Sequence, residues 1–423
     1  MDLFKGDFLK SLVVLLSGTV IAQVLNIAFM PIISRVYTPD EVGFLNFYLQ
    51  IVTFITVVAT LRMELAIPLE KEDSDRYTIL RFASRFAVLF SAISLFFVPF
   101  LSWKEDFSFA LFWVALFIPL GALLHALFNI GMYWSLAQDA FKTISAARLI
   151  RSFSTNSLKV IFGFLNFGGV GLIVSVLIGM FAAVAVYAKD VFRVFKLFPY
   201  KKGSVREKEL MHKHRDFRLF NLPHVLVDLT RDLVLASIIV SFCSTHDYGS
   251  FSQAYIVLRL PLMFVGEAIG QALFAKLIKL IEANQKIGPF VLKLVTGLSL
   301  VSFVPFWLVS EYGVELFQFF LGADWCDAGR YAEVIAWWSM VLFVVSPISF
   351  LPIVLKQQGS YFALNIIRTL CLILATVVPI YLNNQIPLED LLEIVALTQI
   401  GINLLLLVYY GIIIRRNDKK RLV

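Results

Sequence analysis

Charged side chains and cysteines are both scarce in this sequence of 423 residues. Asp, Glu, Lys and Arg make up 16% of it, against about 25% in a soluble domain, so the chain lacks the polar surface that solubility requires. The three cysteines, Cys243, Cys326 and Cys371, show no metal-binding or redox spacing and give no disulfide framework. A nucleophile motif and a phosphate-binding loop are also missing. The sequence therefore predicts no enzyme, no ATP-driven pump and no cofactor.

Hydrophobic residues make up 59% of the chain, including 41 phenylalanines, which predicts an all-α integral membrane protein. A membrane-spanning helix needs about 20 mainly apolar residues, and twelve segments of the sequence meet this requirement. The twelve predicted spans are residues 11–33, 42–69, 82–102, 108–134, 144–166, 169–188, 221–243, 250–275, 289–310, 333–355, 361–382 and 391–414.

The distribution of Lys and Arg predicts the orientation, because the loops on the cytoplasmic side are enriched in these residues. With the N-terminus inside, 27 of the 37 Lys and Arg residues fall in the inward segments, and the outward loops hold only Arg35, Lys104 and Arg330. Both termini are therefore predicted to be cytoplasmic. The net charge of +7 has the same origin, so no nucleic-acid partner is predicted. The inward segments are residues 1–10, 70–81, 135–152, 188–219, 276–288, 356–360 and 415–423.

The longest inward connection separates six predicted spans from six more, which predicts two bundles related by duplication, as in many transporters. The predicted parts are an N-terminal bundle (1–188), a basic cytoplasmic linker (189–219) and a C-terminal bundle (220–423). "DEVGFLNFY" (40–48) and "HDYGSFSQAY" (246–255) each place an acidic residue two positions before a glycine, 206 residues apart. A loop glycine near a helix start is an alternative explanation of this echo.

Charged side chains inside predicted spans are few, and each costs roughly 2.5–3.5 kcal/mol at the bilayer centre on insertion scales. Such residues are expected to turn inward, pair or line water. The census comprises Arg62, Glu64, Lys159, Asp228, Arg231, Asp232, Arg259, Glu267 and Arg368.

Helical geometry sorts these charges. Arg62 and Glu64 are about 200° apart on a helix, so they are not expected to pair with each other; snorkelling at the cytoplasmic interface is an alternative role for both. Asp228, Arg231 and Asp232 share one helix face, which allows them to pair with one another. A purely structural ion network is an alternative role for these three residues.

The fifth span contains further polar residues, in "RSFSTNSLK" (151–159), and we expect it to line a wet cavity with Lys159. Arg259 and Glu267 roughly share a helix face. Snorkelling is the preferred interpretation of Arg368, and helix packing that of His125.

Four segments carry a resemblance to a known family. They are "SGTVIAQVLNIAFMPIISRVYTPDEVGFLNFYLQIV" (17–52), "LRMELAIPL" (61–69), "HDYGSFSQAYIVLRLPLMFVGEAIGQALF" (246–274) and "LGADWCDAGRYA" (321–332). They resemble the Wzx-type polysaccharide flippases of the multidrug/oligosaccharidyl-lipid/polysaccharide exporter superfamily. The resemblance covers the first three-quarters of the chain and says little about which glycan is carried.

The resemblance implies twelve transmembrane helices in two six-helix bundles arranged as a V, in the bacterial inner membrane. It implies that an undecaprenyl-pyrophosphate-linked oligosaccharide moves from the cytoplasmic to the periplasmic leaflet by alternating access, coupled to H⁺ or Na⁺. Membrane lipid and polysaccharide-assembly proteins are the other partners expected. The expected substrate-binding residues are Lys159, Arg231, Arg259 and Arg62. The expected ion-coupling residues are Glu64, Asp228, Asp232 and Glu267.

Two rival functions were weighed against the flippase. A cation-coupled multidrug antiporter of the same superfamily would have a cavity dominated by acids and aromatics, whereas cations are in excess within these spans. A membrane polysaccharide polymerase or ligase would need a large outward loop with catalytic residues. The largest outward loop, residues 310–333, is short and apolar.

Overall fold

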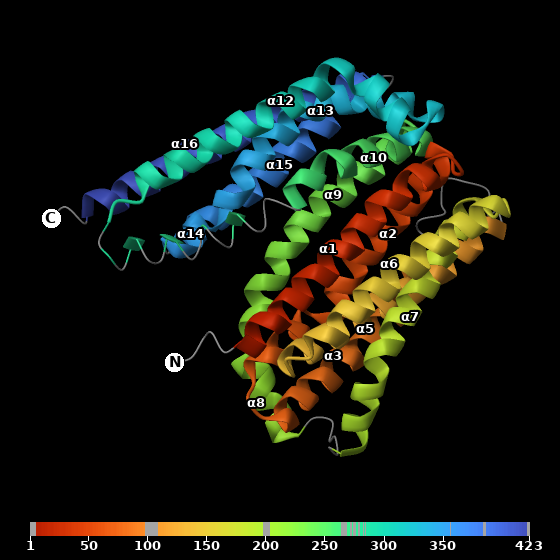
Figure 1. Ribbon diagram of the computed structural model, residues 1–423, viewed down its shortest axis with the longest axis vertical. Coiled ribbons are helices and arrows are strands. Elements are labelled where there is room, and N and C mark those ends of the chain that lie inside the picture. Colours follow the sequence, from red (N-terminus) through yellow and green to blue (C-terminus); the bar gives the residue numbers. More distant parts are fainter. Residues whose placement is uncertain are drawn as a thin grey trace. The chain divides into compact units, whose positions relative to one another are not determined.

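The protein is described here from a computed structural model that covers residues 6–97, 109–197, 204–263, 285–355, 357–383 and 386–420, with isolated positions between 269 and 283. Throughout these residues the secondary structure is helical, with short turns between helices and no strand (Figure 1). The predicted all-α fold class is confirmed. The chain divides into two compact units, residues 1–233 and 234–423.

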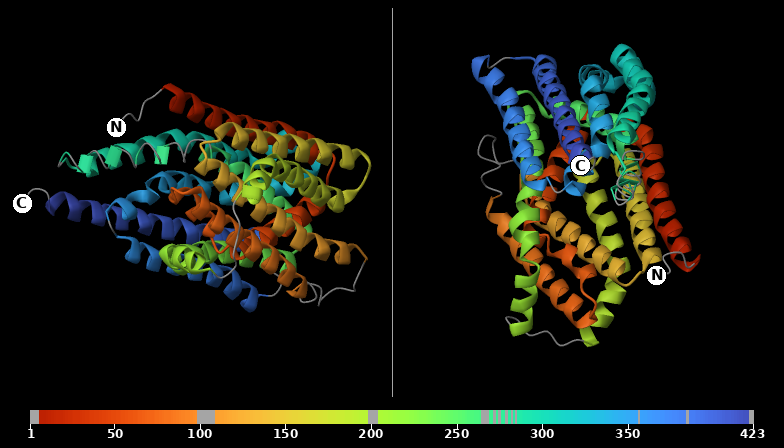
Figure 2. Two further views of the ribbon diagram at one scale, coloured as in Figure 1. Left: turned by 90° about the horizontal axis from the view of Figure 1, so that it is seen from below. Right: turned by 90° about the vertical axis from the view of Figure 1, so that its left-hand side faces the viewer.

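The first unit is a bundle in which α6 contacts both α1 and α7, and α5 contacts α2, α3 and α7. Figures 1 and 2 show α1, α6 and α7 running side by side. Its elements are α1 (Gly6–Ser34), α2 (Pro39–Thr60), η1 (Met63–Leu69), α3 (Asp73–Ile93), η2 (Ser94–Phe97), α5 (Phe109–Ala137), α6 (Phe141–Phe164), α7 (Gly168–Leu197), α8 (Val205–Lys213), η3 (Phe217–Asn221) and the first part of α9 (Leu222–Phe242).

The second unit begins inside α9, between Leu233 and Val234. Figures 1 and 2 show α12, α13 and α16 alongside one another. The limits predicted for the functional bundles and their linker remain a prediction. The helices of this unit are α10 (Thr245–Pro261), α12 (Gly288–Leu321), α13 (Cys326–Val345), α14 (Leu351–Val354), α15 (Gln358–Leu382) and α16 (Leu388–Lys420), with short η5 (Ala323–Trp325) and η6 (Ser346–Phe350) on either side of α13.

The repeated sequence echo marks the starts of two helices. Before α2, the Thr38 side chain accepts a hydrogen bond from the backbone N–H of Glu41, and the Glu41 carboxylate accepts one from the N–H of Thr38, 2.8 Å away. Before α10, Ser244 Oγ accepts from the backbone N–H of Asp247 at 3.0 Å. Such capping satisfies N–H groups that have no partner within the helix. Both units therefore begin a helix with the same cap 206 positions apart.

Small residues let the helices of the first unit approach closely, as is common in membrane bundles. A Cβ added to Gly18 of α1 would lie 2.5 Å from Ser145 Cβ of α6. One added to Gly131 of α5 would lie 2.7 Å from the Tyr187 ring of α7. These contacts leave no room for a methyl group at either glycine.

The predicted linker folds against the first unit. Leu210 and Met211 of α8 are buried in a hydrophobic cluster with side chains of η1, α3 and α5. Glu70, after η1, accepts from His214 Nε2 at 2.5 Å and lies 2.6 Å from Lys213 Nζ. Burial raises the pKa of Glu70, but hydrogen bonds and charge from these two partners outweigh it and hold the pKa below its usual value.

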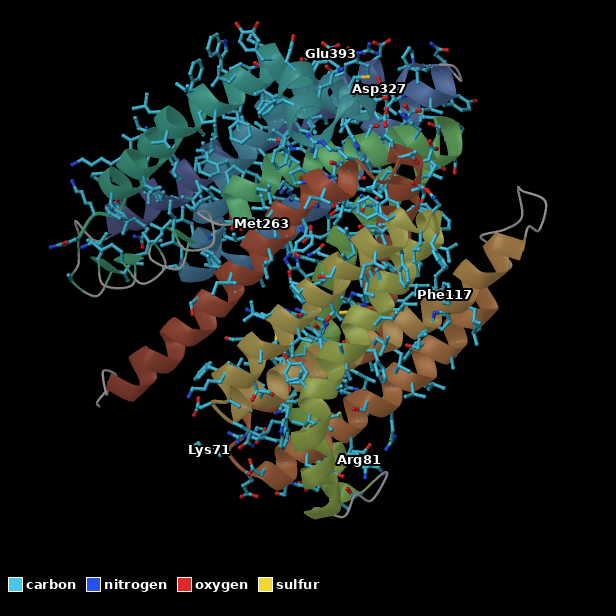
Figure 3. All side chains as sticks on the ribbon, turned by 45° about the vertical axis from the view of Figure 1, so that its right-hand side comes forward. Lys71, Arg81, Phe117, Met263, Asp327 and Glu393 are labelled. Atoms are coloured by element: carbon cyan, nitrogen blue, oxygen red, sulfur yellow. The ribbon has the colours of Figure 1, made fainter. Side chains whose placement is uncertain are left out.

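Two further ion pairs fix α8 to α3, namely Arg206–Asp75 and, at 3.6 Å, Arg85–Glu207. Figure 3 places Lys71 and Arg81 at the same end of the first unit, which is the end where α8 docks.

Eight of the described helical segments are long and apolar enough to cross a membrane, so a multi-pass membrane protein is confirmed. Segments of α3, α6, α9 and α10 also match predicted spans but do not meet this standard. α6 and α9 contain the polar and charged residues singled out in the sequence, and the described part of α10 has 17 residues. The less apolar helices therefore hold the polar residues from which a functional site can be built.

Candidate functional site

The end of α2 contains a backbone break that the sequence did not predict. Leu61 and Arg62 both adopt the left-handed conformation, with φ of 51° and 57°, which is uncommon for residues other than glycine. The chain then continues as the 3₁₀ helix η1. These two consecutive left-handed residues end helix α2. The separation of about 200° between Arg62 and Glu64 assumes a continuous helix and therefore does not apply.

The expectation that Arg62 and Glu64 do not pair is wrong. Arg62 Nη1 lies 3.4 Å from Glu64 Oε1, and Arg62 Nε donates to Asn221 Oδ1 of η3 at 3.0 Å. The Glu64 side chain is 1% exposed, whereas that of Arg62 is 22% exposed. Glu64 Oε2 is buried and accepts no hydrogen bond from the described residues. The pair thus joins a fully buried acid to a cation that reaches accessible space.

Helix α6 presents three basic side chains toward the interior of the first unit. Arg148, Arg151 and Lys159 are all half-buried. Arg148 and Lys159 are eleven residues apart, so they lie within about 20° of each other around the helix and about 16 Å apart along it. These three residues are called the α6 cations below.

The α6 cations lie beside a polar contact with α1. Arg148 Nη1 donates to Thr19 Oγ1, Ser152 Oγ donates to Asn26 Oδ1 at 2.7 Å, and Asn156 Nδ2 donates to the same oxygen at 2.7 Å. Amide and hydroxyl groups that hydrogen-bond between helices are a common means of membrane-helix association. This contact accounts for the serine and asparagine residues that accompany Lys159 in the sequence. The expected wet cavity remains a prediction.

Arg151 is surrounded by soft and aromatic groups. Its guanidinium carbon lies 4.9 Å from the centre of the Phe128 ring of α5, a cation–π distance, and Nη1 lies 3.9 Å from Met180 Sδ of α7. The ring of Tyr187 packs on Phe128 with centroids 5.6 Å apart, and the Tyr187 hydroxyl is buried without a hydrogen-bond partner among the described residues. Arg151 is thus held in place without an acid.

Within the described part of the chain, no carboxylate oxygen lies within 4.0 Å of any α6 cation. Tyr133 of α5 lies within electrostatic range of Arg148, Arg62 and Glu64. Around helix α6, the described side chains therefore have an excess of positive charge, which suits an anionic ligand.

Known proteins resemble this chain in sequence and in fold. The family described as "Polysaccharide biosynthesis protein" matches residues 32–330, well over half of the chain. The chain belongs to this family. No curated protein matches the sequence.

Solved structures of low sequence identity share the fold of this family member. The lipid II flippase MurJ, in an inward closed conformation, matches with a TM-score of 0.72 at 12% identity, over 97% of this chain and 91% of its own. A multidrug resistance MATE family transporter of the MOP superfamily, facing inward, gives 0.69 at 13% identity over 94% and 96%. A MOP superfamily transporter from Pyrococcus furiosus gives 0.61 at 10% identity over 96% and 94%. The family match and this fold confirm the predicted resemblance.

The structure places the remaining candidates of the first unit together in α9. Arg231 Nε lies 2.9 Å from Asp232 Oδ1, and Arg231 Nη1 lies 3.6 Å from Asp228 Oδ1. The internal pairing that the spacing allowed is confirmed. The charge of Arg231 is therefore met by two acids, unlike that of the α6 cations.

The second unit holds the other predicted residues. Arg259 lies over Tyr255, 4.4 Å from the ring centre, and Tyr255 packs against Trp338 with centroids 5.4 Å apart. Arg368 donates to Gln399 Oε1 of α16 at 3.4 Å and is half-buried. The snorkelling predicted for it remains a prediction. Glu267 lies outside the described residues. Figure 3 places Asp327 and Glu393 at the same end of this unit.

Arg148 and Arg151 are residues that the sequence prediction missed. They were counted with the inward segment 135–152, yet they lie seven and ten residues inside α6. A signal for them was present, because Arg148 shares a helix face with Lys159. Both arginines lie near the start of the predicted span 144–166, where basic residues are typical of cytoplasmic loops.

Proposed function

We propose that the protein is a flippase that moves an undecaprenyl-pyrophosphate-linked oligosaccharide repeat unit from the cytoplasmic to the periplasmic leaflet of the bacterial inner membrane. The observation that carries the proposal is the set of α6 cations, which meet no carboxylate among the described residues. The family match to polysaccharide biosynthesis proteins supports it. The fold shared with the lipid II flippase MurJ supports a lipid-linked substrate.

A pyrophosphate matches the α6 cations chemically. Arginine presents a planar fork of donors that binds phosphate oxygens in pairs, and charge-assisted hydrogen bonds of this kind are roughly twice as strong as neutral ones. Arg148 and Arg151 are separated by about 4.5 Å of helix rise, so they reach neighbouring anionic groups. The interior has a low effective dielectric constant, which strengthens the attraction.

Transport is proposed to proceed by alternating access, driven by a H⁺ or Na⁺ gradient. Glu64 is a proposed coupling residue in the first unit, since it is a buried acid and one of its carboxylate oxygens has no partner among the described residues. Asp228 and Asp232 keep Arg231 neutralised in this proposal. Both termini are proposed to be cytoplasmic, and fusions of a phosphatase or a fluorescent protein to each terminus test this.

A direct test follows the lipid-linked pool in cells. Deletion of the gene is expected to accumulate the undecaprenyl-linked repeat unit on the cytoplasmic face and to remove the surface glycan. Arg148→Gln with Arg151→Gln should have the same effect while the protein still inserts in the membrane. Lys142→Gln is the matched control, because Lys142 is exposed on the first turn of the same helix. An unchanged lipid-linked pool with altered drug tolerance would contradict the proposal and favour the multidrug antiporter.

A further inference from the structure

The pair of Arg62 and Glu64 has an unequal environment. Glu64 is fully buried; Thr60 hydrogen-bonds its carboxylate, and Oε2 has no hydrogen-bond partner in the described structure. Arg62 is held by one 3.4 Å contact to Glu64 and by Asn221, and it is partly accessible. The cation can therefore leave the pair toward a ligand, whereas the acid cannot follow it.

Few titratable groups surround Glu64. Arg62, two residues away, acts electrostatically on Glu64, and Tyr133 of α5 lies within electrostatic range of it. Toward η1, helix α3 presents mainly apolar residues together with Tyr77, and η3 contributes the neutral Asn221, which bonds to Arg62. Among the described residues Arg62 is thus the one cation in ion-pair contact with Glu64.

We propose that Arg62 and Glu64 form an exchange switch in which the anionic headgroup of the substrate takes Arg62, and a proton from water takes the place of Arg62 on Glu64. The proton forms an O–H bond on the carboxylate, and Arg62 stays charged and forms hydrogen bonds to phosphate oxygens. One proton is taken up for each headgroup bound, and it returns to the side it came from when Arg62 pairs with Glu64 again. The exchange therefore controls headgroup binding and does not itself supply the driving force for export. The switch rests on the proposed function, because it needs an anionic substrate.

The physical reason is the cost of an unpaired buried charge. If Arg62 left and Glu64 stayed ionised, a fully buried carboxylate would have no counter-ion, which is strongly unfavourable. A group in this position becomes neutral by binding a proton. Arginine stays protonated in proteins, so the carboxylate is the group that titrates.

A consequence for binding follows from linkage. Because the bound state holds one proton more than the free state, affinity for the headgroup falls as pH rises, by tenfold per pH unit where uptake is complete. Without a carboxylate at position 64 this dependence is lost, and Arg62 is released from its competitor. Glu64→Gln should therefore bind the headgroup at least as tightly as the natural protein and independently of Glu64 protonation.

The test is calorimetric binding of geranylgeranyl diphosphate to the purified full-length protein in detergent, between about pH 7.5 and 8.5, well above the second phosphate pKa of about 6, so that the probe itself exchanges no proton. Comparing buffers of different ionisation enthalpy gives the number of protons taken up. The natural protein is expected to take up close to one proton, Glu64→Gln none, and Glu64→Asp a measurable fraction of one. Arg62→Gln should weaken binding at least tenfold and take up none. Glu209→Gln removes an exposed carboxylate of α8 and should behave like the natural protein.

The outcomes separate the switch from the function. Binding by the natural protein with the same proton uptake in Glu64→Gln would overturn the switch and leave the proposed function standing. Failure of the natural protein to bind the diphosphate at all would overturn the proposed function and the switch with it. Loss of uptake in Glu64→Gln, with binding retained and an unchanged unfolding temperature, supports the switch.

Discussion

Replacing Arg151 with methionine is expected to make the protein more stable and inactive. A charge within a span costs roughly 2.5–3.5 kcal/mol, and Arg151 recovers part of this from its contact with the Phe128 ring, which is worth about 0.5–2 kcal/mol. No carboxylate in the described structure offsets the remainder, and the nearby Arg148 adds repulsion. Subtracting the second contribution from the first leaves Arg151 unfavourable for folding by about 0.5–3 kcal/mol.

Methionine fills a similar volume without the charge and adapts to the aromatic surroundings. Arg151→Met should therefore raise the unfolding temperature by several degrees, since each kcal/mol corresponds to about 2–4 °C in a unit of this size. The assay is thermal unfolding of the purified protein, with lipid-linked oligosaccharide export measured in parallel. Lys142→Met, on the exposed first turn of α6, serves as the control and should change neither quantity.

A fall in the unfolding temperature of Arg151→Met would refute this reasoning. It would mean that the arginine is a structural residue whose contacts outweigh its desolvation cost. A rise together with retained export would instead remove Arg151 from the substrate path. The expected combination, higher stability with lost export, is the pattern of a residue kept for function at the expense of folding.

Three further predictions follow from packing, capping and ionisation. Gly131→Ala should destabilise the protein by about 1–3 kcal/mol, because the added methyl group overpacks against Tyr187. Gly297→Ala is the control and should not destabilise the protein, because an added Cβ there meets nothing within 4 Å. Thermal unfolding compares the two variants. Asp418→Ala should lower the free energy of unfolding by about 1 kcal/mol. The Asp418 carboxylate accepts hydrogen bonds from two backbone N–H groups at the start of α12, at 3.1 and 3.0 Å. Denaturant unfolding measures the loss. The docking of α8 should weaken as pH falls below about 4.3, the ordinary pKa of glutamate, because the pKa of Glu70 is lowered in the folded state and its contribution is lost on protonation. A spin label on the exposed side of α8 should then become mobile, and in Glu70→Gln it should already be mobile at pH 7.

Hydropathy sufficed to predict the helices, because a span must bury its backbone polar groups and meet lipid with apolar side chains. It did not suffice at the end of α2. Leu61 and Arg62 give no sequence signal for a left-handed conformation, which glycine or asparagine would have given. The contact between Arg62 and Glu64 depended on that break and could not be deduced from helical spacing.

The docked α8 could have been found in the sequence. Ser204 and Glu207 have the spacing of a capping box, and the Ser204 hydroxyl accepts the N–H of Glu207 at 3.2 Å. The net basic charge of residues 189–219 favours a cytoplasmic linker instead. Its partners on α3 and η1 are distant in sequence, and no local pattern specifies such tertiary ion pairs.

The placement of charge gives the most direct argument about function. Lipid exposure penalises every charged side chain in a span, so a helix keeps one only where a partner or a ligand compensates it. On α9 the compensation is internal, because Arg231 has two acids beside it. On α6 none of the described residues provides it for Arg148, Arg151 or Lys159. In the proposed function, an anionic substrate that enters the first unit supplies the negative charge that the described residues do not provide.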